Sequence, residues 1–284
     1  MQKRGLTAAG LLAPLMIGIA VFFFVPFVIL LVRSFLFGVG LGQFVGLSNY
    51  ISVMGNEMFA LAFANTGKFL VIGVTLNMAL SFLLALVLQK RFAGSKLFRS
   101  VILFPMFLPV AAIVTVFTIF FSDAGLVNGA LVSLSLPVRE WLSGGSAFSL
   151  VLGLYILKSI GYNIVLFLSG LNMIPRELYE TAEIEGAGAV NKVLHITIPL
   201  IAPTTFFVFI ISVMNCFKSF REVFVLGGDH PHSSVYMLPH FINNNMQNLN
   251  YQRLAVASVI TVAVVAVAVW LLYRGEGRLE AKLR

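Results

Sequence analysis

Residues 174–203 read IPRELYETAEIEGAGAVNKVLHITIPLIAP, a polar stretch that separates two long apolar runs of the chain. It holds four of the eleven acidic residues of the protein, which are Glu177, Glu180, Glu183 and Glu185. A segment with this density of charge cannot lie in the hydrocarbon core of a bilayer. The stretch therefore marks a point at which the chain leaves the apolar surroundings that the runs on either side require.

The same stretch carries the signals of two short helices joined by a turn. Pro175 suits the first position of a helix, and Glu177 follows where the helix dipole favours a negative charge. Gly186 and Gly188 allow the backbone to turn sharply, and helical spacing of apolar residues then resumes until Pro199. We expect a helix, a glycine turn and a second helix on the cytoplasmic face of a membrane. The alternative is a solvated linker that docks nothing.

The composition places the whole chain in a membrane. Of the 284 residues, 59% are apolar and 11% are charged, and the mean hydropathy is +0.97, whereas a soluble domain has about 25% charged residues. The apolar residues form six runs near the length of a membrane-spanning helix, at residues 11–32, 69–88, 101–121, 148–171, 200–217 and 254–273. The alternation typical of membrane β-strands is absent. The sequence therefore predicts an all-α polytopic membrane protein with six transmembrane helices.

A net charge of +8 is typical of a protein that binds nucleic acid. The distribution of the basic residues along this chain instead indicates the topology of a membrane protein. With the N-terminus in the cytoplasm, twelve of the 19 basic residues face the cytoplasm: Lys3, Arg4, Lys90, Arg91, Lys96, Arg99, Arg176, Lys192, Arg274, Arg278, Lys282 and Arg284. Because cytoplasmic loops of membrane proteins are rich in lysine and arginine, both termini are predicted to be cytoplasmic. The first run is too long for a cleaved signal peptide, so it is predicted to remain as the first span.

The polar stretch resembles a loop of a known family. Glu180-Thr181-Ala182, three residues, Gly186, nine residues and Ile196-Thr197-Ile198-Pro199 are similar to the EAA loop, EAA-x3-G-x9-I-x-L-P, of importer permeases. In the sugar branch the region commonly reads IPxELYEAAxIDGA, which residues 174–187 resemble. Three departures, Thr181, Glu185 and Ile198, conserve size or charge. The chain is thus identified as a member of the permease subunits of binding-protein-dependent ABC importers, of the sugar type that takes maltose, multiple sugars or glycerol phosphate.

This resemblance implies a bacterial inner-membrane protein with the type I importer permease (MetI-like) fold. It divides the chain into a first helix and outer loop (1–59), a permease domain (60–273) with a coupling loop at 172–199, and a cytoplasmic tail (274–284). In the family this loop seats in a cleft of an ATP-binding subunit. By resemblance Glu180 makes the polar docking contact, Thr181 and Ala182 pack closely, and Gly186 makes the turn.

The resemblance also implies the partners. They are a second homologous permease, two ATP-binding subunits and an extracytoplasmic solute-binding protein, and the chain would form half of a pathway that works by alternating access. No GxxxxGK[ST] phosphate loop occurs here, so ATP and Mg²⁺ are expected on the partner ATPase and no cofactor is expected on this chain. The chain is predicted not to be an enzyme.

Polar side chains within the apolar runs are candidates for the solute pathway, because burying them in a membrane is costly. Lys158, Tyr162 and Asn163 lie in the fourth run, and Asn215 and Phe217 lie in the fifth. Lysine, phenol and amide groups suit a hydroxyl-rich carbohydrate, and a phenylalanine ring suits sugar stacking. The alternatives are hydrogen bonds between helices for the polar residues and lipid or packing contacts for Phe217.

Two other classes of function are alternatives to an importer permease. An ion-coupled secondary transporter would need carboxylates within the membrane, and none of the six runs contains Asp or Glu. A membrane enzyme would need clustered acids, histidines or metal ligands. His230, His232 and His240 lack the spacing of metal ligands, so no metal site is predicted.

Overall fold

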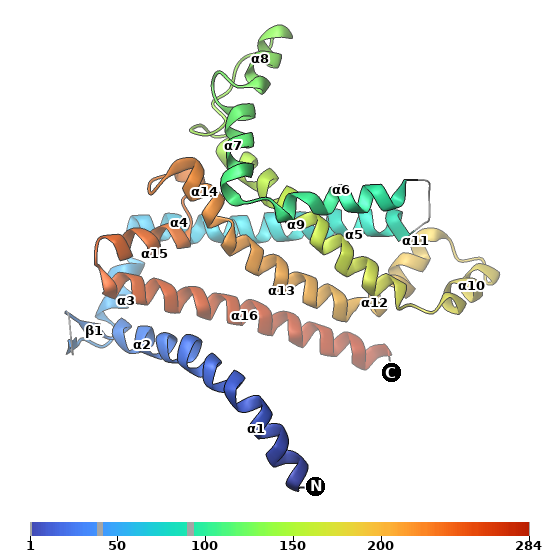
Figure 1. Ribbon diagram of the computed structural model, residues 1–284, viewed down its shortest axis with the longest axis horizontal. Coiled ribbons are helices and arrows are strands. Elements are labelled where there is room, and N and C mark those ends of the chain that lie inside the picture. Colours follow the sequence, from blue (N-terminus) through green and yellow to red (C-terminus); the bar gives the residue numbers. More distant parts are fainter. Residues whose placement is uncertain (1, 39–41, 90–93, 284) are drawn as a thin grey trace. The chain divides into compact units, whose positions relative to one another are not determined.

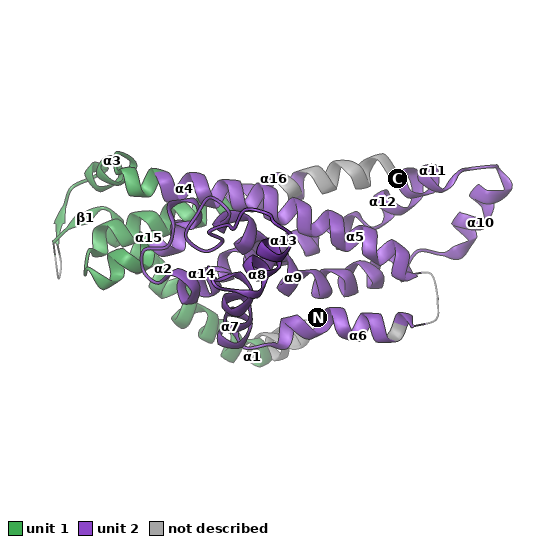
Figure 2. Cartoon of the chain, turned by 90° about the horizontal axis from the view of Figure 1, so that it is seen from above, with its two compact units in different colours: residues 1–60, 241–265 green, residues 61–240, 266–284 purple. Residues whose placement is uncertain are grey.

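The computed structural model describes residues 2–38, 42–89 and 94–283, and nearly all the regular structure in them is helical (Figure 1). The chain forms two compact units, unit 1 (residues 1–60 and 241–265) and unit 2 (residues 61–240 and 266–284), which Figure 2 distinguishes by colour. Lys90, Arg91 and Arg284, which the charge argument assigns to the cytoplasm, lie outside the described residues.

The elements up to residue 133, in chain order, are α1 (Gln2–Ile19), the π-helical η1 (Ala20–Phe24), α2 (Val25–Ser34), β1 (Leu36–Phe37), β2 (Gln43–Phe44), α3 (Ser48–Met54), α4 (Glu57–Phe69), the π-helical η2 (Leu70–Val74), α5 (Thr75–Gln89), α6 (Ser95–Phe107), α7 (Val110–Phe121) and α8 (Leu126–Ser133). The remaining elements are α9 (Ala147–Asn172), α10 (Arg176–Ile184), α11 (Ala189–Lys192), the π-helical η3 (Val193–Thr197), α12 (Ile198–Leu200), α13 (Ala202–Lys218), α14 (Phe220–Gly227), the 3₁₀ turn η4 (Ser233–Val235), α15 (Leu238–Gln247) and α16 (Tyr251–Leu283).

Unit 1 begins with the first span. Its apolar part, Leu11–Ser34, confirms the run expected at residues 11–32. The chain then turns through a two-stranded antiparallel ribbon in which Leu36 pairs with Phe44. The Asn49 amide donates to the carbonyl oxygens of Ser34 at 3.0 Å and Leu36 at 2.9 Å, and it thereby fixes α3 to the end of the first span.

The second span begins earlier than its hydropathy indicates. The start expected at residue 69 is wrong, because one continuous helical stretch runs from Glu57 to Gln89. The polar residues at its start have partners within unit 2. The Asn65 amide donates to the carbonyl oxygens of Ser233 and Tyr236, and the Lys68 ammonium lies 4.4 Å from the centre of the Phe148 ring. Such contacts offset the cost of placing polar groups in a long membrane helix.

The third apolar run, residues 101–121, is not a single helix. It breaks between α6 and α7, where Leu108 is extended (φ −70°, ψ 135°) and Pro109 follows. Proline lacks a backbone donor and disfavours the helical conformation in the residue before it. The prediction of one third span is therefore wrong. The stretch that is long and apolar enough to cross a membrane is Val110–Ser133, formed by α7 and α8.

Helix α9 is the central helix of unit 2, and it confirms the fourth run. It packs against α5, α6 and α13. Glycines allow two of these approaches to be close, because a Cβ at Gly161 would lie 2.2 Å from the carbonyl oxygen of Ile102 in α6, and one at Gly170 would lie 2.4 Å from Thr204 Oγ1 in α13. Buried apolar side chains fill the space between these helices, among them Ala85, Leu88, Ile164, Phe167 and Val208.

The fifth span differs most from its prediction at residues 200–217. It is a pair of helical stretches, Ala189–Leu200 and Ala202–Gly227, bent by 72°. Since the second stretch continues to Gly227, residues 218–227 belong to this span and not to an outer loop. The statement that no span contains a carboxylate is consequently wrong, because Glu222 is buried in α14. The sixth run is confirmed by the apolar stretch Tyr251–Leu271 at the start of α16.

Candidate functional site

The coupling-loop segment has the expected helix, glycine turn and helix, formed by α10, Gly186 and α11. Gly186 adopts the left-handed conformation (φ 80°), which glycine reaches without a steric penalty. The Gly186 N–H donates to the carbonyl oxygen of Glu183 at 3.0 Å, and the Ala187 N–H donates to that of Ala182 at 2.8 Å. This pair of bonds is the Schellman motif, which ends a helix by satisfying its last carbonyl groups. The turn is therefore well defined.

Two side-chain contacts hold the second arm of the loop against the first. The Lys192 ammonium lies 2.5 Å from the Glu183 carboxylate, and this exposed ion pair lowers the pKa of Glu183 below its ordinary value. The hydroxyls of Tyr179 and Thr197 lie 2.8 Å apart, and Thr197 is buried. The coupling-loop segment, residues 172–199, is consequently a folded unit, and we call it the elbow.

The four residues predicted to couple to an ATPase lie on this elbow. Glu180, Thr181 and Gly186 are exposed, whereas Ala182 is 9% exposed and thus faces the chain's own interior. Ile184, at the tip of α10, is 89% exposed. Figure 1 shows α10 and α11 at the end of unit 2 that lies away from α14. Because the apolar side chain of Ile184 is exposed to solvent at the end of α10, a partner protein can contact it.

The second candidate site is a cavity of about 370 Å³ within unit 2. Helix α9 lines it with Lys158, Ser159 and Tyr162, and the fifth span lines it with residues from 211 to 222. The break in the third run contributes Met106 and Val110, one from each side of the break. Interrupted helices in membrane proteins occur where they line a cavity or are buried in protein. The cavity thus accounts for the irregular third run.

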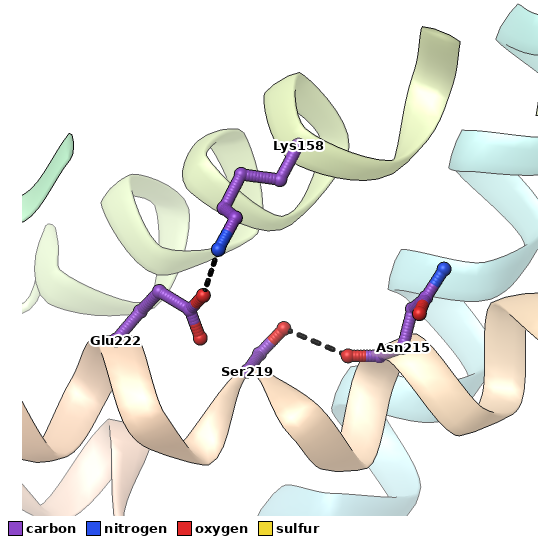
Figure 3. Close-up of polar contacts among 4 residues, drawn as sticks. All are labelled: Lys158, Asn215, Ser219 and Glu222. Carbon is purple, nitrogen blue, oxygen red and sulfur yellow. Dashed lines mark hydrogen bonds and ion pairs between the residues drawn. The ribbon is translucent and has the colours of Figure 1, made fainter. Parts of the chain in front are cut away.

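An ion pair crosses this cavity. The Lys158 ammonium donates to Oε1 of Glu222, and Figure 3 shows the lysine reaching from α9 toward α14. One turn away, the Ser219 hydroxyl donates to the backbone carbonyl oxygen of Asn215 at 3.1 Å. Glu222 is 6% exposed, so its pairing with a cation is what makes its burial tolerable.

The other predicted pathway residues divide into two groups. Tyr162 and Asn215 line the cavity with Lys158. Asn163 is fully buried and does not line it, because its amide donates to the Ser212 hydroxyl at 2.8 Å and so joins α9 to α13. Phe217 is half-buried and is also absent from the lining. For Asn163 the structure thus shows the interhelical hydrogen bond that was the alternative to solute contact.

Three charged residues that line the cavity were not among the predicted pathway residues, namely Lys218, Arg221 and Glu222. All three lie after residue 217, where the fifth apolar run was predicted to end. The available signal was Lys158 itself, since a lysine in an apolar run requires a counter-charge somewhere in the fold. In the described parts of the chain no three His, Cys, Asp or Glu side chains gather where they could hold a metal ion; the absence of a metal stays a prediction.

Known proteins resemble this chain over most of its length. Residues 77–281 match the family described as "Binding-protein-dependent transport system inner membrane component". The chain is 32% identical over 219 residues to the arabinooligosaccharides transport system permease protein AraP of Bacillus subtilis (strain 168), covering 75% of this chain and 70% of that relative. It is 31% identical over 229 residues to the sn-glycerol-3-phosphate transport system permease protein UgpA of Yersinia pseudotuberculosis serotype I (strain IP32953), covering 78% and 77%.

Solved structures show the same fold. One is a bacterial ABC transporter involved in the import of the acidic polysaccharide alginate, with a TM-score of 0.83 at 21% identity over 97% of this chain and 96% of that one. The other is the bacterial alginate ABC transporter in complex with an alginate pentasaccharide-bound periplasmic protein, with a TM-score of 0.84 at 20% identity over 98% and 96%. None of these matches supports an ion-coupled transporter. The chain is a multi-pass membrane protein with the type I importer permease fold, and it belongs to the family of binding-protein-dependent transport system inner membrane components, the permease subunits of ABC importers.

Proposed function

We propose that this chain forms half of the transmembrane pathway of an ATP-driven importer for a carbohydrate or a related hydroxyl-rich solute. A second homologous permease supplies the other half, and an extracytoplasmic solute-binding protein delivers the solute. Two ATP-binding subunits hold ATP and Mg²⁺ and do the hydrolysis. The cavity beside Lys158 and Glu222, together with the sugar and glycerol-phosphate transport named for the relatives, supports this solute class.

The observation that carries the proposal is the folded elbow of residues 172–199. Its tip is exposed, its turn is fixed by the Schellman bonds of Gly186, and its second arm is held by the Glu183–Lys192 pair. A folded projection of this kind transmits a push from a docked partner to two neighbouring spans, namely α9 and the part of the fifth span after its bend, Ala202–Gly227. Those two spans also line the cavity. Movement of the elbow can thus open the pathway to one side of the membrane and then to the other.

In this proposal each of the four predicted residues has its own role. Glu180 makes a polar contact with the ATP-binding subunit, and Thr181 packs beside it. Ala182, buried beneath them, allows α10 to lie close to the rest of the chain, and Gly186 keeps the turn. The elbow is then cytoplasmic, and so are both termini, as the distribution of basic residues along the sequence predicts.

The test is performed with the assembled transporter in proteoliposomes. Glu180→Ala removes the docking carboxylate, and Gly186→Pro removes both the N–H of the Schellman motif and the required positive φ. We expect both variants to insert normally, to lose copurification with the ATP-binding subunit and to lose ATP-driven uptake. Glu140→Ala, which removes an exposed carboxylate between α8 and α9, is the matched control and should transport normally.

Three results would count against the proposal. Normal uptake by both elbow variants would exclude coupling through this loop. Uptake that continues when ATP is depleted but stops when an uncoupler is added would indicate ion coupling. A reporter fused to either terminus that proved accessible from the outside would contradict the topology.

A further inference from the structure

The cavity in unit 2 carries more positive than negative charge. Three cationic side chains, Lys158, Lys218 and Arg221, line it with one carboxylate, that of Glu222. Lys158 is matched by Glu222. Neither Lys218 nor Arg221 forms an ion pair with any residue in the described part of the chain. Two positive charges at the cavity are therefore uncompensated.

A second observation indicates that the cavity is built to hold a polar ligand. Glu222 is 6% exposed, and its Oε2 atom is buried without a hydrogen-bond partner in the described residues, although Oε1 accepts from Lys158. A buried carboxylate oxygen without a partner costs free energy unless a donor reaches it. In the described chain the Lys158 ammonium also donates only to Glu222, which leaves two of its three N–H groups for other acceptors.

The polar groups of the cavity lie in two places, and each place suits a different kind of ligand group. Lys158 and Glu222 form a donor and acceptor pair in the buried part of the cavity, which suits the hydroxyl groups of a solute. Lys218 and Arg221 are exposed residues one helical turn apart, at the junction of α13 and α14, and they provide cations at its more open part. The apolar side chains of Met106, Leu154 and Met214 make up much of the remaining wall. Low-polarity walls strengthen the attraction between these cations and an anion.

We propose that this cavity binds solutes that carry an anionic group, a carboxylate or a phosphate, in addition to their hydroxyls. The hydroxyls bind to Lys158 and Glu222, and the anionic group binds to Lys218 and Arg221. This inference rests on the proposed function, since it names the solute class that the pathway accepts. A neutral sugar would leave the two cations unmatched beside an apolar wall.

The experiment measures binding to the purified, complete transporter without ATP, at low ionic strength, with three probes. A trimer of galacturonic acid carries carboxylates, a trimer of galactose carries the corresponding hydroxyls without them, and galactose 6-phosphate carries a phosphate. We expect at least one of the two acidic probes to bind about tenfold more tightly than the galactose trimer, because two partly screened charge contacts each contribute a few-fold in affinity. The preference should decrease in 0.5 M salt.

Variants assign the preference to the two cations. The double variant Lys218→Gln/Arg221→Gln should bind all three probes equally, and Lys218→Arg with Arg221 intact should keep the preference. Arg139→Gln, which removes an exposed cation that does not line the cavity, should behave as the wild type. Which acidic probe binds distinguishes a carboxylate from a phosphate.

Three results overturn the inference: equal or tighter binding of the galactose trimer, no binding of either acidic probe, or an acidic preference that survives in the double variant. These are distinguishable from failure of the proposed function, which is read from the loss of ATP-driven uptake in Glu180→Ala. A transporter that is driven by ATP through the elbow but prefers neutral sugar would refute the charge assignment alone.

Discussion

The elbow and the cavity of unit 2 are each stabilised by contacts between side chains and backbone groups. The two regions differ in how far apart along the sequence the contacting residues lie. In the elbow, Gly186 and Glu183 find their partners within a few residues along the chain, and the Glu183–Lys192 pair spans nine. In the cavity, Lys158 and Glu222 are 64 residues apart, and Asn163 reaches Ser212 across 49. The elbow can therefore keep its local shape while it moves, whereas the cavity exists only when α9 and the fifth span are correctly packed.

This difference predicts unequal responses to mutation. Removing one group from the cavity leaves another group buried without its partner, at a cost to the stability of the whole unit. Removing one group from the elbow affects a solvated segment, so stability changes little while coupling changes a great deal. Four substitutions, of Lys158, Gly161, Gly186 and Glu183, test this contrast in decreasing order of expected effect.

Lys158→Ala should have the largest effect, because it leaves the Glu222 carboxylate buried and unpaired. We expect the free energy of unfolding to fall by about 3 kcal/mol, measured by thermal or denaturant unfolding of the purified chain in detergent. The double variant Lys158→Met/Glu222→Leu should recover most of the loss, since no charge is then left unpaired. Lys218→Ala, at a cavity residue without an ion pair, is the control. An unchanged stability in Lys158→Ala would show that the pair has no structural role.

Gly161→Ala should come next. Its new methyl group would lie 2.2 Å from the carbonyl oxygen of Ile102, so α6 and α9 must separate. We expect a loss of about 2 kcal/mol from this overpacking, together with a change in solute binding because α6 lines the cavity. Gly153→Ala is the matched control, since it lies in the same helix and its Cβ would meet nothing within 4 Å. Equal stability of the two variants would refute the close helix approach.

Gly186→Ala tests the local stability of the elbow. Nothing lies within 4 Å of the added methyl group, so its whole cost comes from the positive φ, about 1 kcal/mol. Hydrogen exchange should show weaker protection of the Ala187 amide while global unfolding is unaffected. Gly188→Ala, whose φ of −67° suits any residue, should leave protection unchanged. A global loss of stability in Gly186→Ala would show that the elbow is not an independent local unit.

The Glu183–Lys192 pair should give the smallest effect, because both side chains are partly solvated. Lys192 lowers the pKa of Glu183 below its ordinary value, so the pair stabilises the folded elbow above that value and its contribution is lost as the pH falls through the lowered pKa. We expect the protection factors of the elbow amides to decrease between pH 6 and pH 3. Glu183→Gln should show weaker protection and no such pH dependence. A wild-type profile as flat as that of the variant would exclude the pair as a contributor.

The same contrast of range explains what the sequence could predict. The elbow was predictable because proline, glutamate and glycine signals for caps and turns act over a few residues, and the EAA pattern lies in one continuous stretch. The sequence drew attention to Lys158, Tyr162 and Asn215 because polar residues stand out in apolar runs; the three line the cavity, and their contact with a solute stays a prediction. Glu222 was missed because its burial depends on a partner on another helix, which hydropathy along the chain does not record.

The helix boundaries also differ in whether the local sequence could predict them. The first, fourth and sixth spans match their apolar runs. The second span starts at Glu57 because Asn65 and Lys68 find partners far along the chain, and the third run breaks because the cavity accommodates the backbone around Pro109. Whether Asn163 contacts solute or another helix was undecidable without the position of Ser212.

The break at Leu108 also bears on how the cavity can change shape. Below the break, α6 is pressed against α9 at Gly161, and above it α7 packs on α14. No hydrogen-bonded helical ladder runs through Leu108, so rotation about the backbone dihedrals of this one residue alters the angle between α6 and α7 without unwinding either. Met106 and Val110 line the cavity from opposite sides of that joint, so a change in the angle between α6 and α7 would change the distance between these two lining residues.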